Sequence, residues 1–206
     1  MGYNLFGGFM YSIKNDIENI YEIKKSKFIT KLYKINNIDE IDKILNNLNK
    51  EYKDATHICY GYIINSQEKC SDNGEPSGTA GLPILNVLKK NELQNVLAVV
   101  IRYFGGIKLG AGGLVRAYSN SVIDALKLTK KIELTEGYLI ELEFSYDNVK
   151  LIDYMLNDKN IINKEYNNSI IYKFYLNKEE LSFVPELEKV AIHISTMDKT
   201  LIEKND

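Results

Sequence analysis

The sequence predicts an α+β protein of two domains, because charge and glycine are both distributed unevenly along its 206 residues. Residues 1–134 carry a net charge of +4, whereas residues 135–206 carry −6. Eight of the 13 glycines lie within 74–113, and only Gly137 comes later. Such shifts in composition commonly separate domains. The hydrophobic fraction of 45% and charged fraction of 26% are ordinary for folded proteins, so a largely disordered chain is excluded.

The predicted boundary lies near residues 134–137. We therefore expect three parts: a loose N-terminal tail over 1–17, a first domain over 18–134 and a second domain over 135–206. The uncharged start lacks the basic residues of a secretory signal. No stretch is apolar enough over ~20 residues to cross a membrane, so we expect no membrane partner. Cys59 and Cys70 are expected to be free thiols of a cytoplasmic protein.

The first domain opens with a strand-like run over 20–35, in which apolar and charged residues alternate unevenly. A helix follows, with Asn37 as its expected N-cap and Glu40 at the capping-box spacing. Residues 57–65 predict a further strand. Residues 96–104 are nearly continuous in apolar residues, which is typical of a central strand buried on both faces.

Two glycine-rich loops each precede a predicted helix. The first loop, SDNGEPSGTAG over 71–81, leads into a helix that ends near Lys90. The second loop, GGIKLGAGG over 105–113, leads into a helix over 114–128. Glycine permits positive φ and a close approach of other groups to the backbone. Loops of this kind therefore suit either ligand binding or tight chain packing.

The second domain predicts strands and helices in the order βαββαβ, which is the ferredoxin-like pattern. Asp147 can cap its first helix, and Asn167-Asn168 is a hairpin signal. The expected elements are a strand over 138–146, a helix after Asp147, strands over 160–166 and 170–176, a helix over 178–189 and a strand over 190–195.

Arginine marks the second glycine-rich loop, because only two of the 26 basic residues are Arg and they bracket it as Arg102 and Arg116. Arg is the better bidentate partner for phosphate or carboxylate. A cation in a buried strand must be paired or face an opening. Arg102 therefore pairs with a carboxylate such as Asp72 or Glu75 and holds two loops together, or contacts a ligand, or does both.

The second loop also lies at the start of a helix, where free backbone N–H groups and the helix dipole favour an anion. The alternative is a tight turn whose glycines serve packing alone. The loop fits neither the Walker A nor the Rossmann pattern, so no nucleotide cofactor is expected. The residues expected to contact an anionic partner are Ser77, Thr79, Arg102, Gly105, Gly106, Lys108, Gly110, Gly112, Gly113 and Arg116.

His57, Asp72 and Glu75 are the candidate catalytic residues, since each could act as a base near the first loop. Asp72 and Glu75 could also hold Mg²⁺. The opposing interpretation is that acidic residues and Asn73-Gly74 belong to an ordinary turn and that His57 is a packing residue. We expect neither a metal nor a cofactor.

Several blocks resemble the YigZ/IMPACT family: SKFIT (26–30), ATHICYGY (55–62), CSDNGEPSGTAGLPIL (70–85) and VVIRYFGGIKLGAGGLVRAYSNSV (99–122). The resemblance implies a first domain of the type found in a small-subunit ribosomal protein and in domain IV of elongation factor EF-G. It implies an EF-G-type ferredoxin-like second domain and a cytosolic protein. The eukaryotic member IMPACT regulates translation, partly through a separate domain that is absent here. Asn73 departs from the Asp often found in the family, which weakens a metal site.

We therefore expect a non-enzymatic, cytoplasmic binding or regulatory protein linked to translation. Its partner would be RNA or a ribosome-associated protein, held by the basic glycine-rich face. The acidic second domain argues against RNA binding there. The alternative is a small-molecule enzyme, a hydrolase or transferase, that acts on a phosphorylated or acidic substrate between the two loops.

Overall fold

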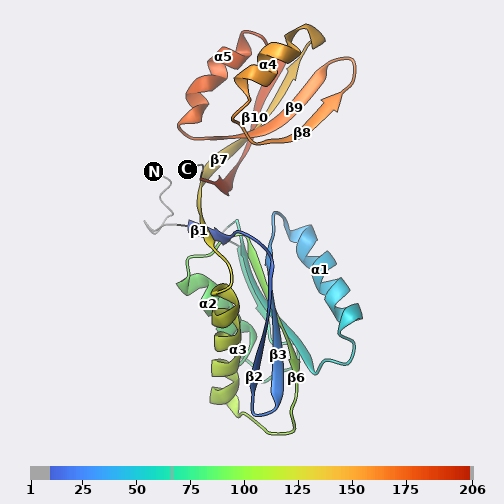
Figure 1. Ribbon diagram of the computed structural model, residues 1–206, viewed down its shortest axis with the longest axis vertical. Coiled ribbons are helices and arrows are strands. Elements are labelled where there is room, and N and C mark those ends of the chain that lie inside the picture. Colours follow the sequence, from blue (N-terminus) through green and yellow to red (C-terminus); the bar gives the residue numbers. More distant parts are fainter. Residues whose placement is uncertain (1–9, 66, 205–206) are drawn as a thin grey trace. The chain divides into compact units, whose positions relative to one another are not determined.

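The computed structural model describes residues 10–65 and 67–204 (Figure 1). These residues form two compact units that divide between Glu133 and Leu134. Each unit contains a β-sheet with helices packed on it. The mixed α and β architecture predicted from the sequence is confirmed. The domain limits of 18–134 and 135–206 stay a prediction, as do the ribosomal-protein and ferredoxin-like classes.

The sheet of the first unit has five antiparallel strands with β6 at its centre (Figure 1). Helix α1 covers one face, and α2 and α3 cover the other. In spatial order the strands are β2 (Ile17–Ile23), β3 (Ser26–Lys34), β6 (Val96–Tyr103), β4 (His57–Ile64) and β5 (Gln67–Ser71). The helices are α1 (Ile38–Glu51), α2 (Gly81–Lys90) and α3 (Ala111–Leu126).

The burial of β6 on both faces explains why its residues 96–101 are all apolar. Ala98 and Val100 pack in the core on the α2 and α3 side, whereas Leu97, Val99 and Ile101 pack on the α1 side. All five side chains are fully buried. Since successive residues of a strand point to opposite faces, a strand covered on both sides needs apolar residues at every position. The predicted central strand is therefore confirmed.

The capping box of α1 is confirmed as well. The Asn37 side-chain oxygen accepts a hydrogen bond of 3.0 Å from the backbone N–H of Glu40. The Glu40 carboxylate reaches back and accepts from the backbone N–H of Asn36 at 2.9 Å. The first bond satisfies a backbone donor that the first turn of a helix otherwise leaves without a partner, and the second holds the residue before the N-cap.

The strand predicted over 20–35 is two strands, β2 and β3, joined at Lys24 and Lys25. Both lysines have positive φ, 47° and 64°. A two-residue turn of this hand matches the twist of a hairpin, but Asn and Gly are its usual residues. Lys is no turn signal, so the alternation of apolar residues across the turn predicts one continuous strand where the structure has two.

The predicted loose tail is wrong for residues 10–17, and residues 1–9 lie outside the described part. Strand β1 (Met10–Ile13) pairs with β7 (Lys131–Phe144), whose first residues belong to this unit. Ile13 is fully buried in the core, and the backbone N–H of Tyr11 donates to the Glu92 carbonyl at 3.0 Å. The segment is thus anchored by apolar burial and by backbone pairing.

In the second unit, β7 continues into a sheet of spatial order β10-β7-β9-β8, and these three pairings are antiparallel. The predicted order βαββαβ is observed. Asp147 lies within a 3₁₀ turn, Tyr146–Asn148, before α4, and no side-chain cap bond forms there. A second 3₁₀ turn, Glu180–Phe183, precedes α5. The remaining elements are α4 (Val149–Met155), β8 (Ile161–Tyr166), β9 (Ile170–Asn177), α5 (Val184–Glu188) and β10 (His193–Glu203).

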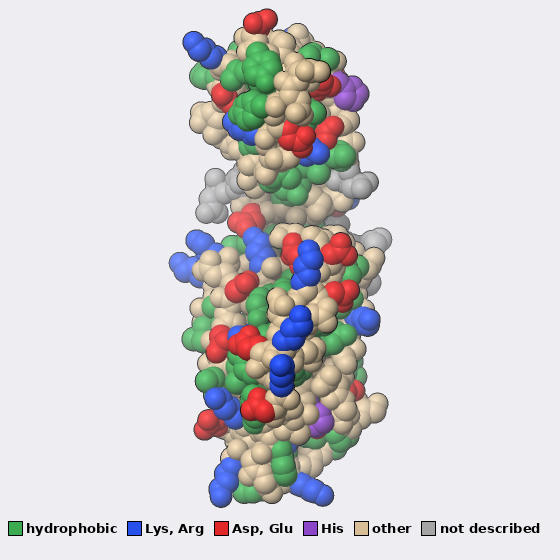
Figure 2. All heavy atoms as spheres, turned by 90° about the vertical axis from the view of Figure 1, so that its right-hand side faces the viewer, with side chains coloured by type: hydrophobic (Ala, Val, Ile, Leu, Met, Phe, Trp, Pro, Cys, Tyr) green, Lys and Arg blue, Asp and Glu red, His purple; other side chains and the backbone are tan. Residues whose placement is uncertain are grey.

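Charged side chains of both signs are interspersed on the face that Figure 2 shows. At the end of the first unit that carries the β2–β3 turn, Lys or Arg side chains project beside exposed hydrophobic ones (Figure 2). Among the described residues, no helix is both long and apolar enough to cross a membrane.

Candidate functional site

Three side chains from neighbouring strands meet near the end of β6 that leads into the second glycine-rich loop. Arg102 of β6 is paired in register with Phe28 of β3 on one side and with His57 of β4 on the other. Directly paired residues of a sheet point to the same face. Since Phe28 belongs to the core beneath α2 and α3, Arg102 and His57 lie on that face too.

Arg102 is held by a buried carboxylate. Its Nη1 donates to Oε1 of Glu75, and the Tyr118 hydroxyl donates to the same oxygen at 2.9 Å. The side chains of Arg102 and Glu75 are only 6% and 3% exposed. The predicted pairing of Arg102 with a carboxylate is therefore observed, with Glu75 as the carboxylate. We call His57, Glu75, Arg102 and Tyr118 the polar cluster.

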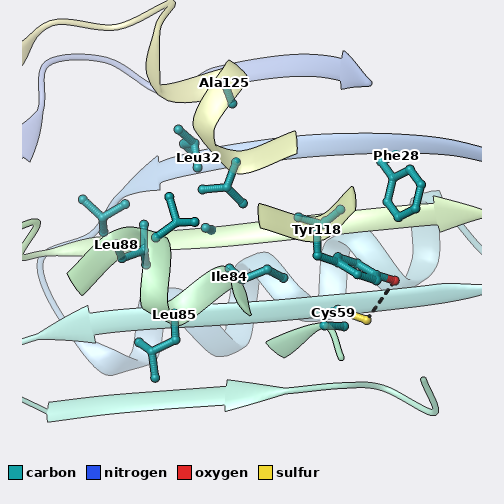
Figure 3. Packing of buried hydrophobic residues seen from close by; sticks show 14 of the residues in the cluster. Phe28, Leu32, Cys59, Ile84, Leu85, Leu88, Tyr118 and Ala125 are labelled. Carbon is teal, nitrogen blue, oxygen red and sulfur yellow. Dashed lines mark hydrogen bonds between the residues drawn. The ribbon is translucent and has the colours of Figure 1, made fainter. Parts of the chain in front are cut away.

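Aromatic rings and a thiol lie against this cluster. Figure 3 shows the Tyr118 hydroxyl of the cluster and the Cys59 thiol, joined by a hydrogen bond. The Arg102 guanidinium lies 5.5 Å from the ring centre of Phe28 and 5.6 Å from that of Phe104, within cation–π range. The Cys59 thiol lies 3.4 Å from the Tyr118 hydroxyl and 3.0 Å from the Asp72 carbonyl oxygen. Burial raises the pKa of Cys59 to about 12 and raises the pKa of Tyr118 far above its ordinary value.

The two cysteines are expected to differ in reactivity because only the thiolate reacts. Cys59 is fully buried with a pKa of about 12, whereas Cys70 is half-buried. With Ellman's reagent near pH 8, Cys70 should react in the folded protein and Cys59 only after denaturation. Cys70→Ser should leave a native protein with no fast-reacting thiol. Fast labelling of that variant would contradict the burial of Cys59.

His57 is the member of the cluster that reaches solvent, with a side chain 21% exposed. Its Nδ1 lies 2.8 Å from the Asn73 carbonyl oxygen. A carbonyl oxygen only accepts, so we assign the proton of the neutral ring to Nδ1. Nε2 is then an acceptor, and it lies 3.9 Å from Oε2 of Glu75. The ring is oriented as a proton acceptor would be.

The Asp72 carboxylate is bound by backbone N–H groups, which makes it a poor base. Its carboxylate accepts hydrogen bonds of 2.8, 2.9 and 2.8 Å from the backbone N–H groups of Gly78, Ala80 and Gly81. Burial alone would raise the pKa of Asp72, but these three donors lower it below its ordinary value. The carboxylate thereby caps α2, whose N-cap residue is Ala80 and has no capping side chain.

The stability that Asp72 provides should depend on pH. Because its folded pKa is depressed, this stability is present above the unfolded pKa of ~3.9 and is lost as the pH falls through the folded value. Near pH 7, Asp72→Asn should lower the free energy of unfolding by about 0.5–2 kcal/mol, as for a lost helix cap. Urea titrations of both proteins should converge as the pH is lowered through the acid range. A difference that does not change with pH would contradict this role.

The other predicted residues of the first loop differ in their exposure to solvent. Thr79 is buried, and its hydroxyl donates to the Pro76 carbonyl at 2.6 Å. Ser77 is exposed. Within the described ranges, no group of three or more His, Cys, Asp or Glu side chains has the arrangement of a metal site. The first loop therefore uses its polar groups to hold its own structure.

The second loop has a different geometry. Gly105 packs directly against the backbone of Lys25, since a Cβ there would lie 2.0 Å from the Lys25 carbonyl carbon and oxygen. Gly106 and Gly110 have φ of 82° and 72°. Gly110 is the N-cap of α3 and provides no capping side chain, and Gly112 and Gly113 lie in the first turn. The first N–H groups of α3 are therefore left to solvent or a partner.

Five cations lie on or beside this loop: Lys24, Lys25, Lys27, Lys108 and Arg116. Within residues 10–65 and 67–204, none of the five forms an ion pair or a side-chain hydrogen bond. All but Lys27 are exposed. Three apolar side chains are exposed on the same stretch: Phe104, Ile107 and Val115. We call these eight residues the loop end.

The structure thus divides the predicted site residues between two places. His57, Glu75 and Arg102 belong to the polar cluster, whereas Lys108 and Arg116 belong to the loop end and the glycines of 105–113 form the backbone beside it. Sequence reasoning missed Lys24, Lys25 and Lys27, because it did not recognise the turn that brings them there. It also missed Cys59 and Tyr118. Cys59 lies two residues after His57, and this spacing in a strand could have placed both side chains on one face.

Comparisons with known proteins agree on one family. Residues 24–126 match the family model described as the Impact N-terminal domain. The chain is 34% identical over 203 residues to IMPACT family member YvyE of Bacillus subtilis, which covers 94% of each protein. It is 37% identical over 167 residues to IMPACT family member YigZ of Escherichia coli, covering 76% of this chain and 80% of that protein. A crystal structure described as that of a hypothetical protein aligns with a TM-score of 0.65 at 27% identity, over 96% of this chain and 98% of the other.

Proposed function

The chain belongs to the IMPACT family, and we propose that it is a non-enzymatic, cytoplasmic regulatory protein of translation that engages an anionic partner through its loop end. The partner would be RNA or a ribosome-associated protein. The resemblance to a family with a translational regulator supports the cellular process. The exposed cations of the loop end support a partner with negative charge.

The observation that carries this proposal is the set of five cations that form no ion pair among the described residues, of which Lys108 lies in the loop before α3 and Arg116 near the start of that helix. A lysine on a protein surface commonly finds a carboxylate neighbour when one is near, and here none is within bonding distance among the described residues. Cations that neutralise phosphates in this way contribute much of a protein's affinity for a polyanion. The second unit, with its net charge of −6 over 135–206, has the wrong sign for this task.

We do not include Arg102 among the residues that meet the anion in this proposal. Its charge is balanced by Glu75, and both side chains are buried. An anion that replaced Glu75 at Nη1 of Arg102 would leave that carboxylate buried without its cation. In this proposal Arg102 supports the loop end from below, and Lys108 and Arg116 meet the partner.

Binding of anionic probes tests the proposal. A labelled oligouridine RNA and a labelled oligoglutamate peptide are titrated with the protein at low and moderate salt, by fluorescence anisotropy. Lys108→Ala/Arg116→Ala should weaken at least one probe about tenfold and flatten its salt dependence. Lys150→Ala/Lys178→Ala removes the same charge from exposed positions of the second unit and serves as the control. Equal effects of the two double variants, or no binding at low salt, would contradict the proposal.

The polar cluster favours a second candidate, an enzyme that acts on a phosphorylated or acidic small molecule. The observation behind it is the oriented His57 ring, whose Nε2 faces Oε2 of Glu75 at 3.9 Å. A thermal-shift screen of nucleotides and phosphorylated metabolites tests it, because a ligand at about 100 Kd stabilises a protein by about 2.7 kcal/mol. A hit that His57→Gln abolishes would favour the enzyme over the binding protein.

A further inference from the structure

We infer that the loop end docks a protein segment in which apolar side chains stand beside carboxylates, and that RNA is not its partner. This rests on the proposed function and names the chemistry of the partner. It follows from the apolar side chains of the loop end, because binding to an anion through positive charge alone would give them no role.

Three large apolar side chains of the loop end are exposed although a folded core lies close by. Phe104 is 46% exposed, Ile107 44% and Val115 38%. They alternate along one stretch with Lys108 and Arg116. Interfaces between proteins combine an apolar core with a polar rim, and this surface carries side chains of both kinds. Carboxylates on a partner would meet the cations while its apolar side chains cover these three.

An RNA strand would use this surface poorly. Its phosphates would meet the cations, but single-stranded RNA gains most of its further affinity by stacking bases on aromatic rings. Of the three exposed apolar side chains, only Phe104 is aromatic. Ile107 and Val115 would stay in water or be covered by polar sugar and phosphate groups. The aliphatic side chains therefore favour a protein partner.

The surface is also held in place before any partner arrives. The backbone N–H of Phe104 donates to the Thr56 hydroxyl at 2.9 Å, and that of Gly105 donates to the Ser26 hydroxyl at 3.2 Å. Below the Phe104 ring lies the Arg102 guanidinium, which is itself fixed by Glu75. An ordered surface loses little conformational entropy on binding, which favours affinity.

Three probes separate the protein partner from RNA. The first is a labelled peptide of repeated Leu-Glu-Glu-Leu units, the second is the same peptide with every Leu replaced by Ser, and the third is oligouridine. The wild-type protein should bind the Leu peptide about tenfold more tightly than either of the others, a difference of about 1.4 kcal/mol. Similar affinity for the two peptides, or tighter binding of oligouridine, would overturn the inference.

Variants assign the preference to this surface. Ile107→Ser should remove most of the preference for the Leu peptide and leave binding of the Ser peptide unchanged. Leu128→Ser, at an exposed position just beyond the other end of α3, is the matched control and should change neither. Circular dichroism confirms that both variants are folded. If Leu128→Ser has the same effect as Ile107→Ser, the apolar surface is not the docking site.

Different results would contradict the two claims, that the loop end binds an anionic partner and that it docks apolar side chains of a protein. If Lys108→Ala/Arg116→Ala weakens every probe but Ile107→Ser weakens none, the anionic partner stands and the apolar docking fails. If no probe binds at low salt, both fail.

Discussion

Replacing Arg102 with Met should lower the free energy of unfolding of the first unit by about 3–5 kcal/mol, because it leaves a buried carboxylate without its cation. Glu75 is 8% exposed and has its Oε1 between Arg102 and Tyr118. Met fills much of the volume of Arg, so the loss would report the missing charge more than a cavity. The unfolding is followed by urea titration, with hydrogen exchange of peptides from β4 and β6 to assign the transition to this unit.

A second variant separates the charge from the packing. Replacing an ion pair on both sides is far less costly than replacing one partner, so Arg102→Met/Glu75→Gln should recover a large part of the lost stability. Lys108→Ala, an exposed substitution in the same unit, should change the free energy by less than about 0.5 kcal/mol. The role assigned to Glu75 would be wrong if the double variant were no more stable than Arg102→Met.

Gly105→Ala should destabilise the first unit by about 3 kcal/mol, the upper end of what overpacking commonly costs. An added Cβ would lie 2.0 Å from the Lys25 carbonyl group and 2.4 Å from the Ser26 backbone nitrogen. Both are backbone atoms of the β2–β3 hairpin, so no side-chain rotation can relieve the contact. Thermal unfolding and hydrogen exchange in β3 would show the loss.

The neighbouring glycine provides the matched control. A Cβ at Gly106 would meet nothing within 4 Å, but its φ of 82° is costly for alanine. Gly106→Ala should therefore cost only about 1–2 kcal/mol, as expected for the left-handed conformation. If the two alanine variants were equally stable, the close approach of Gly105 to the backbone of the β2–β3 turn would be refuted.

The sequence predicted much of the fold because its strongest signals were local. The apolar run at the start of β6 and the Asn37–Glu40 capping box each lie within a short stretch of consecutive residues, and the structure contains both. The turn at Lys24 and Lys25 could not be predicted in the same way. Its positive φ values are imposed by the pairing of β2 with β3, and lysine gives no local sign of them.

The sequence predicted several residues of the candidate site but not the contacts between them. Composition placed two arginines around a glycine-rich loop and left open whether Arg102 would meet a ligand or a carboxylate. That choice depends on the partners of β6 in the sheet and on where α3 places Tyr118, which are long-range facts. Asp72 and Glu75 stand three residues apart in sequence, yet one caps a helix and the other lies in a buried ion pair.

Because of the Asp72 cap, substitutions in the first glycine-rich loop should affect folding more often than substitutions of exposed side chains in the second. In 71–81 the side chains close on their own backbone, so most exchanges there would be removed by selection for a folded protein. In 105–113 the exposed Lys108 contributes little to folding, so its retention would report selection by whatever the protein meets. Retention of Asp72 and Gly105 among relatives would thus record folding, whereas retention of Lys108 would record recognition.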